Sequence, residues 1–160
     1  MAGLTAVALG GAASGSCGGG GDSVSSEDAG TVDAGFVLTC QDDPRVTAYA
    51  PGITATSIDG QMKVVFMSAD PAPPADGLDS WSVKITDGSG NPLPNLPLIG
   101  SPTTLFMPDM GHGANAPYID GGAGGIYNYT EANLFMPGIW RVTFAVDGGE
   151  SAQIFFCITG

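Results

Sequence analysis

Apolar and polar residues alternate along several short stretches in the second half of the chain. In the stretches 80–86 and 140–146, every second residue is large and apolar, and the residues between them are small, polar or charged. The apolar positions are Trp81, Val83 and Ile85 in the first stretch and Trp140, Val142, Phe144 and Val146 in the second. A period of two with one polar face is typical of antiparallel strands that pack on one side. Residues 61–68 and 152–158 are rich in apolar side chains and indicate two further strands.

Turn-forming residues separate these stretches. The turn signals are Asp59-Gly60, the segment 87–92, Pro137-Gly138 and Asp147-Gly148-Gly149. Glycine and proline are abundant, at 26 and 12 of 160 residues, and no stretch shows a helical period. About seven strands with turns at this spacing predict an all-β fold, an antiparallel sandwich of two sheets.

The first 35 residues have the composition of an export segment followed by a tether. Residues 4–13 form an apolar run that is too short to span a bilayer and is typical of a secretory signal. Cys17 follows small residues, as in the processing site of bacterial lipoproteins, although Ser14 stands where that motif prefers leucine. We therefore predict a signal segment at 1–17 with lipidation of Cys17, a flexible glycine-rich tether at 18–35 and one folded domain at 36–160. Cleavage by an ordinary signal peptidase, with Cys17 incidental, is the alternative.

The other two cysteines, Cys40 and Cys157, lie near the two ends of the predicted domain. An even pair in an exported chain favours a disulfide, and the sequence has no C-x-x-C motif that would indicate a zinc or redox site. We expect Cys40 on the first strand and Cys157 on the last. The bond would close a loop of roughly 117 residues and stabilise the fold by about 4–5 kcal/mol on a chain-entropy argument. Two free buried thiols are the alternative.

The chain is strongly acidic, with 16 Asp and Glu residues against 4 Lys and Arg and a net charge of −12. This charge disfavours nucleic acids and anionic lipid surfaces as partners, because both are bound by basic faces. The sequence has one histidine, no Ser/His/Asp spacing and no nucleophile elbow, which favours a protein without catalytic residues. A carboxylate pair among so many acids is left open. Several aspartates near glycines lack the spacing of a calcium loop and are interpreted as turn formers; these are Asp42, Asp43, Asp76, Asp79 and Asp120.

The segment 106–113 contains the only histidine of the chain and two of its six methionines. Its pattern Met107-Pro108-x-x-Gly111-His112 precedes Gly125-Ile126-Tyr127 and then Phe135-Met136-Pro137-Gly138-Ile139-Trp140. This order resembles the YtkA-like domain family, which is related in style to FixH-like and CopC-type β-sandwiches of the bacterial envelope. The resemblance covers residues 81–158 and implies an immunoglobulin-like sandwich with a link to copper or to cytochrome oxidase assembly. Relatives often have a second histidine where this chain has Met110.

Thioethers and an imidazole are soft or borderline ligands, which favour Cu(I) over Mg²⁺, Ca²⁺ or Mn²⁺. Met110 and His112 flank one glycine, so in an extended chain both side chains would project to the same side. Met107 or Met136 would complete a three-ligand site, and Asp109 would accept a hydrogen bond from the imidazole. The alternative is that the methionines pack in the core and the histidine bonds to a turn.

Together these patterns predict an exported, lipid-anchored protein of the periplasm or the cell surface that holds or passes on copper without catalysis. Its partners would be the membrane, through the lipid anchor, and a protein of the envelope, but no nucleic acid. A structural or protein-interaction module without a small ligand is the alternative from a different class.

Overall fold

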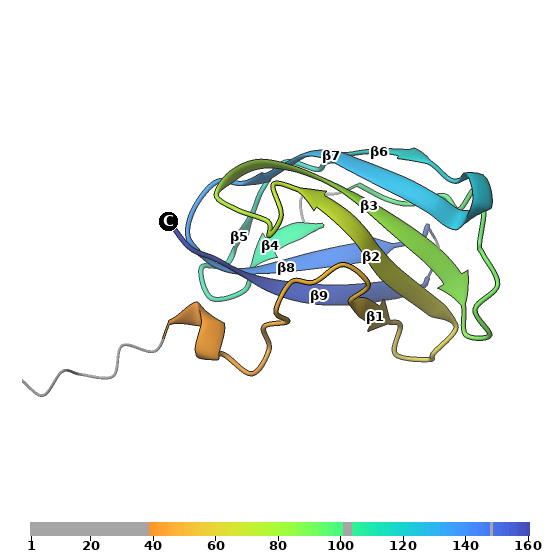
Figure 1. Ribbon diagram of the computed structural model, residues 1–160, viewed down its shortest axis with the longest axis horizontal. Coiled ribbons are helices and arrows are strands. Elements are labelled where there is room, and N and C mark those ends of the chain that lie inside the picture. The colour runs from red at the N-terminus through yellow and green to blue at the C-terminus, as the bar shows by residue number, and fades with distance from the viewer. Residues whose placement is uncertain (1–38, 101–103, 148) are drawn as a thin grey trace, which may run out of the picture. The chain divides into compact units, whose positions relative to one another are not determined.

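The structure is a computed structural model that describes residues 39–100, 104–147 and 149–160. Within these ranges the chain forms nine strands and two short 3₁₀ helices. Figure 1 shows how the strands are arranged. The strands are β1 (Thr54–Thr56), β2 (Met62–Asp70), β3 (Gly77–Asp87), β4 (Leu105–Met107), β5 (His112–Gly113), β6 (Tyr118–Gly121), β7 (Ile126–Leu134), β8 (Gly138–Ala145) and β9 (Ser151–Ile158). The 3₁₀ helices are η1 (Cys40–Asp42) and η2 (Ala123–Gly125). The predicted signal segment, the predicted tether and Cys17, the predicted site of lipidation, lie outside the described residues.

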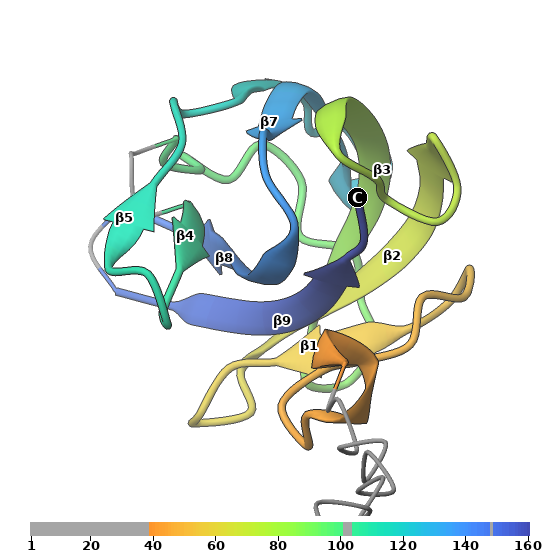
Figure 2. The ribbon, with the colours of Figure 1, turned by 90° about the vertical axis from the view of Figure 1, so that its left-hand side faces the viewer.

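The strands form two sheets that face each other (Figure 2). One sheet has the order β1-β2-β3-β7-β6 and the other the order β5-β4-β8-β9, and all pairings between these strands are antiparallel. With β2 counted as the first strand, this is the A-B-E-D and C′-C-F-G arrangement of immunoglobulin-like sandwiches. The predicted all-β sandwich is therefore confirmed, with nine strands in the described ranges where about seven were expected.

The core lies between the two sheets and contains the predicted alternating positions. The buried positions are Trp81, Val83 and Ile85 on β3 and Trp140, Val142 and Phe144 on β8. Phe66 of β2 lies among them, with ring centroids 5.6 Å from Trp81 and 6.4 Å from Phe144. Val146, also expected to point inward, follows the end of β8, where it is half-buried and pairs with Leu98. Burial of these apolar side chains is the main force that holds the sheets together.

Strand β7 has a polar sequence that the alternation of apolar residues did not identify. Tyr127 and Tyr129 alternate with polar residues, and both rings are buried. The Tyr127 hydroxyl donates to the Leu93 carbonyl and accepts from the Leu96 amide, both at 2.7 Å. Because the hydroxyl is bonded, the ring can be buried without the cost of an unpaired polar group. These bonds also fasten the connection between β3 and β4 to the sheet.

Cys40 and Cys157 form the predicted disulfide, with their Cα atoms 5.4 Å apart. Cys157 lies on β9, the last strand, as expected. The expectation that Cys40 lies on the first strand is wrong, because Cys40 opens the 3₁₀ helix η1. Asp42 accepts hydrogen bonds from the Thr39 amide and hydroxyl, at 3.1 and 2.9 Å, and this capping closes the chain into a turn.

Asp79 is not part of the expected turn, whereas Pro137-Gly138 does lie where the chain turns between two strands. Asp79 lies on β3 with its side chain buried, and its Oδ1 atom accepts a hydrogen bond from the Ala75 amide at 3.0 Å. It is therefore not a turn former. Pro137-Gly138 does mark a change of direction, but this segment carries the chain from β7 in one sheet to β8 in the other.

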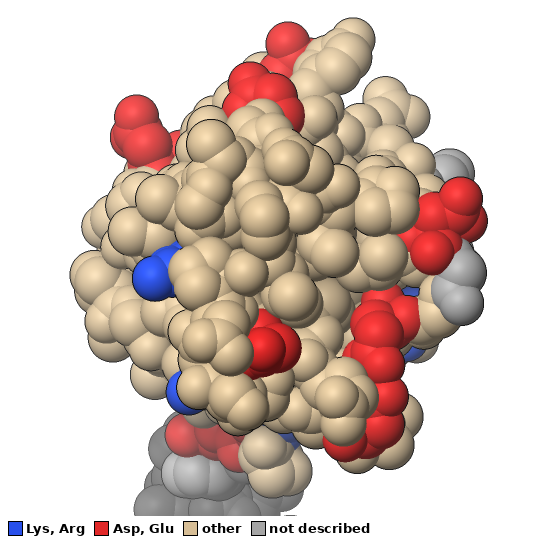
Figure 3. Space-filling view, turned by 90° about the vertical axis from the view of Figure 1, so that its right-hand side faces the viewer, with Lys and Arg blue, Asp and Glu red and all other residues tan. Residues whose placement is uncertain are grey.

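Charged side chains on the described surface are mostly acidic. On the end of the sandwich that faces right in Figure 1, shown in Figure 3, Asp and Glu form several separate groups among uncharged residues, and few Lys or Arg are seen. Separation of like charges lowers their mutual repulsion. This distribution lets the domain carry a large share of the chain's net charge of −12.

Candidate metal site

Met107 and His112 face each other across the short hairpin that β4 and β5 form. The two residues are Cα partners, and the turn between them spans residues 108–111. The amides of Met110 and Gly111 donate to the Met107 carbonyl at 3.2 and 2.9 Å, and Gly111 has a φ of +72°. Glycine adopts this left-handed conformation without the penalty of a Cβ. Directly opposed residues of an antiparallel pair point to the same face, so Met107 and His112 share one side of the sheet.

Met110 lies at the tip of this turn. Its side chain is 57% exposed, whereas that of Met107 is 2% exposed. The prediction that Met110 and His112 project to the same side is wrong, because it assumed an extended chain. The left-handed Gly111 reverses the chain between them, and the Met110 side chain borders a neighbouring pocket instead.

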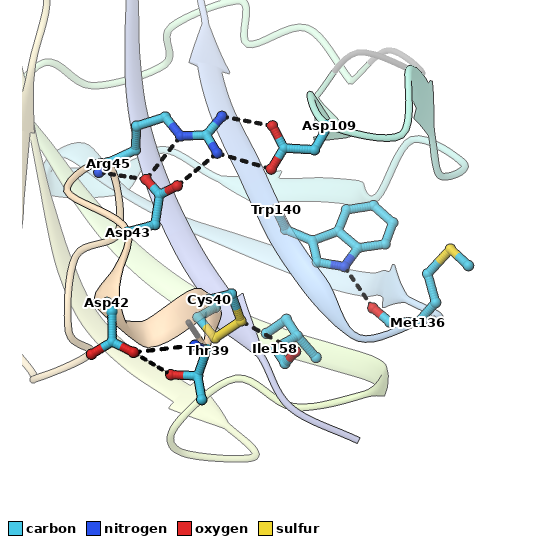
Figure 4. Close-up of a disulfide and its surroundings, with 10 residues drawn as sticks. Thr39, Cys40, Asp42, Asp43, Arg45, Asp109, Met136, Trp140 and Ile158 are labelled. Atoms are coloured by element: carbon cyan, nitrogen blue, oxygen red, sulfur yellow. Dashed lines mark hydrogen bonds and ion pairs between the residues drawn. A yellow bond between two sulfur atoms is a disulfide. The ribbon is translucent and has the colours of Figure 1, made fainter. Parts of the chain in front are cut away.

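Met136 comes from the crossover that leads from β7 to β8. Its carbonyl accepts a hydrogen bond from the Trp140 indole Nε1 at 2.9 Å, as Figure 4 shows. Trp140 is fully buried, so this bond anchors the crossover to the core. In the same view the Met136 thioether points away from the disulfide.

The His112 imidazole and the Met136 thioether are in contact. The His112 Nε2 atom lies 3.3 Å from the Met136 Sδ atom. If Nε2 carries the proton, this contact is a weak N–H···S hydrogen bond, and in the other neutral tautomer Nε2 offers a lone pair. An imidazole nitrogen binds zinc at about 2.0 Å and a sulfur at about 2.3 Å, so two such ligands of one ion lie roughly 3–4 Å apart. The observed separation falls in this range.

Phe135 supports the imidazole from one side. The rings of His112 and Phe135 stack with centroids 5.9 Å apart and an interplanar angle of 18°. Phe135 meets Trp140 edge-on, at 5.4 Å and 77°. The stack limits the orientations that the imidazole can take beside Met136. The sequence showed Phe135 as a neighbour of Met136, but it held no signal for the contact with His112, which comes from a different element.

Asp109 is not available to the imidazole, because Arg45 binds it. The Nη1 and Nη2 atoms of Arg45 donate to the two Asp109 oxygens at 2.9 and 2.8 Å, and the same guanidinium binds Asp43 (Figure 4). The bond from Arg45 lowers the pKa of Asp109 below its ordinary value. The predicted role of Asp109 beside the histidine is therefore wrong, since its partner lies 64 residues away in the sequence. The candidate metal ligands that remain near the imidazole are uncharged thioethers.

Of the four predicted ligands, the structure brings His112 and Met136 into contact and places Met107 opposite His112. Met110 stays at the exposed tip of the turn. Within the described ranges, no group of three or more His, Cys, Asp or Glu residues is placed to hold a metal ion. Thioether ligands are a separate class, to which this finding does not apply. No helix in the described part of the chain is long and apolar enough to cross a membrane.

No protein-family model, curated protein or solved structure matches the chain. The resemblance of residues 81–158 to the YtkA-like family stays a prediction from motifs. The structure does provide a physical reason for one of them, Met136-Pro137-Gly138-x-Trp140. Gly138 has a φ of +136°, and a Cβ at this position would lie 2.6 Å from the Met107 methyl group. The backbone conformation therefore favours glycine here, and a larger residue would also displace the Met107 methyl group.

Proposed function

We propose that the domain is a non-catalytic copper-binding module that holds one Cu(I) ion between His112 and Met136. The observation that carries this proposal is the 3.3 Å separation of His112 Nε2 and Met136 Sδ. The two side chains come from different elements. The Phe135 ring stacks on His112, and the Trp140 indole donates a hydrogen bond to the Met136 backbone. An imidazole and a thioether at ligand distance from each other suit one soft ion.

Met107 is the third ligand that the geometry favours. It lies opposite His112 on the same face of the sheet, and its methyl group reaches Gly138, two residues after Met136. Three neutral ligands add no negative charge, so they suit a monovalent ion better than a divalent one. Met110, at the exposed tip of the turn, is left out of this ligand set.

The place of action in this proposal is the bacterial envelope. A lipid on Cys17 and the tether at 18–35 would hold the domain at a membrane surface, in the periplasm or on the cell surface. The Cys40–Cys157 disulfide fits an oxidising compartment. His112 and Met136 are half-buried and not enclosed, which suits a protein that passes its ion to a protein partner in the envelope.

A Cu(I) titration against a competing chelator tests the ligand set. The full chain with Cys17→Ser is the starting protein, because a free thiol would bind Cu(I) by itself. Thiol reductants are left out, since they would reduce the disulfide and compete for the ion. We expect His112→Ala and Met136→Leu each to weaken Cu(I) binding at least about tenfold. Met67→Leu, at an exposed methionine of β2, is the matched control and should bind as the parent protein does.

A structural or protein-interaction module is the second candidate function. The stack of His112, Phe135 and Trp140 favours it, because the contacts between these rings are by themselves a reason for the position of His112. The same titration separates the two functions. If His112→Ala and Met136→Leu bind Cu(I) as tightly as Met67→Leu does, the contact is one of packing and the copper proposal fails.

A further inference from the structure

A pocket of about 400 Å³ lies beside the candidate metal site. Its walls come from the segment 39–44, the β4–β5 hairpin and residues 137–139. This volume is in the range of pockets that hold small organic ligands. Neither His112 nor Met136 lines the pocket, so it is distinct from their contact.

Two long-range links hold the walls of this pocket in place. The Cys40–Cys157 disulfide ties η1 to β9, and the Arg45–Asp109 ion pair ties the following segment to the hairpin turn (Figure 4). Cys40 and Asp109 themselves line the pocket. A pocket with walls held in this way is formed before a ligand arrives, which lowers the ordering cost of binding.

One part of the pocket wall is apolar. Met107, Pro137 and Ile139 line it, and the exposed Met110 side chain extends the wall toward solvent. Gly138 contributes no side chain, and the Met107 methyl group occupies the space where a Cβ would lie. An apolar group that enters the pocket would therefore exchange water for hydrocarbon contacts.

The border of the pocket is acidic. Asp42, Asp43 and Asp109 line it, and Arg45 binds the last two of these carboxylates. One cation is thus shared by two acids, and the border keeps a net negative charge. Asp42 uses its Oδ2 atom for both bonds from Thr39, and its Oδ1 atom has no hydrogen-bond partner among the described residues.

We propose that this pocket binds an apolar group that carries one positive charge, of the ammonium or guanidinium type. The apolar part lies against Met107, Pro137 and Ile139, and the cation lies at the acidic border beside Asp42, the carboxylate that Arg45 does not bind. The acidic border favours a positively charged ligand. An anion of the same shape would approach three carboxylates and only one guanidinium, which is already paired. The net charge of −12 also raises the local concentration of cations. This inference does not depend on copper binding.

Three six-carbon probes of different charge test the proposal on the full chain: hexylammonium, hexan-1-ol and hexanoate. With methionine methyl groups labelled for NMR, we expect hexylammonium to shift the Met107 and Met110 signals to saturation and to leave Met62 and Met67 in place. Hexan-1-ol should bind more weakly, and hexanoate should cause no saturable shift.

Asp42→Asn should weaken hexylammonium binding about fivefold, the size of one Coulomb interaction at 4 Å in water. Its amide oxygen can still accept the bonds from Thr39, and an unchanged signal of the buried Met62 shows that the variant is folded. Asp147→Asn removes the same charge at an exposed residue outside the pocket and should bind as the wild type does. Equal binding of hexylammonium and hexanoate, or equal effects of the two variants, would overturn the proposal.

Discussion

Asp79 shows at the scale of single residues how burial changes side-chain chemistry. Its side chain faces the core from β3 and is 1% exposed, and burial raises its pKa to about 6. The Ala75 amide, which donates to Oδ1, opposes this rise, while the charges of Asp70 and Asp76 add to it. The Oδ2 atom is buried and has no hydrogen-bond partner within the described part of the chain. Asp79 therefore keeps its proton up to a higher pH in the folded protein than in the unfolded chain.

We expect Asp79→Asn to remove one contribution to the pH dependence of stability. Between about pH 4 and pH 6, Asp79 binds more protons in the folded state than in the unfolded state. The contribution of Asp79 to stability is therefore full below about pH 4 and is lost as the pH rises through about 6. At pH 7 the loss is on the order of 2–3 kcal/mol, and the neutral asparagine avoids it.

Urea unfolding at several pH values between 4 and 7 measures this difference. The free energy of unfolding of Asp79→Asn should rise relative to that of the wild type as the pH increases. Asp147→Asn, at an exposed carboxylate, serves as the control and should follow the wild-type curve. Parallel curves for Asp79→Asn and the wild type would show that the carboxyl group titrates normally in the folded protein.

At the scale of elements, the crossover between β7 and β8 connects the candidate metal site to the neighbouring pocket. Met136 offers its thioether to His112 and its carbonyl to the Trp140 indole. Pro137 and Gly138, the next two residues, line the pocket. The crossover therefore contacts both the candidate metal site and the pocket. Its direction depends on the unusual backbone conformation of Gly138, which has a φ of +136°.

Gly138→Ala should destabilise the protein by about 1–3 kcal/mol, because a residue with a Cβ is strained at this φ. The Met107 methyl group would also have to move away from the new Cβ. Denaturant unfolding measures the loss. Gly149→Ala is the matched control, since its Cβ would meet nothing within 4 Å and its φ is not in the left-handed range, and it should stay within about 0.5 kcal/mol of the wild type. Equal stabilities of the two variants would contradict this account of Gly138.

At the scale of the whole described domain, three of the links between the segment before β1 and the sandwich lead to β9 and to the β4–β5 turn. These are the Cys40–Cys157 disulfide, the Arg45–Asp109 ion pair and the bond from the Thr47 amide to the Phe155 carbonyl at 2.8 Å. β9 is the outer strand of its sheet, so the bond from Thr47 also gives a hydrogen-bond partner to one backbone carbonyl at the free edge. The disulfide is the only covalent one of the three and fixes the segment most firmly.

Replacement of both Cys40 and Cys157 by alanine should lower the free energy of unfolding by about 4–5 kcal/mol, because the unfolded chain loses the constraint of a long closed loop. The midpoint of urea unfolding gives the loss. Wild-type protein treated with a thiol reductant should unfold at the same urea concentration as the variant, and should recover its stability when it is reoxidised. A variant as stable as the oxidised wild type would show that the bond contributes little.

The sequence by itself determined the fold class and much of the core. A strand that packs on one side needs an apolar residue at every second position. The pattern at 80–86 and at 140–146 therefore predicts the sandwich from local sequence alone. The residue types of the candidate metal site, one imidazole and several thioethers, were likewise visible in the sequence. Strand β7 was not, because its buried tyrosines depend on partners such as Leu93 in a distant loop.

Only the tertiary structure decided which of those candidate ligands meet. Met110 and His112 are neighbours in sequence but are separated by the turn at Gly111, whereas Met136 reaches His112 from another element. Asp109 forms an ion pair with Arg45, which is far away in the sequence, and not with His112. These contacts depend on which strands become neighbours: β5, β4 and β8 lie side by side in one sheet, and the segment before β1 lies against the β4–β5 turn. Residues that are far apart in the sequence meet there, and their sequence neighbours carry no sign of it.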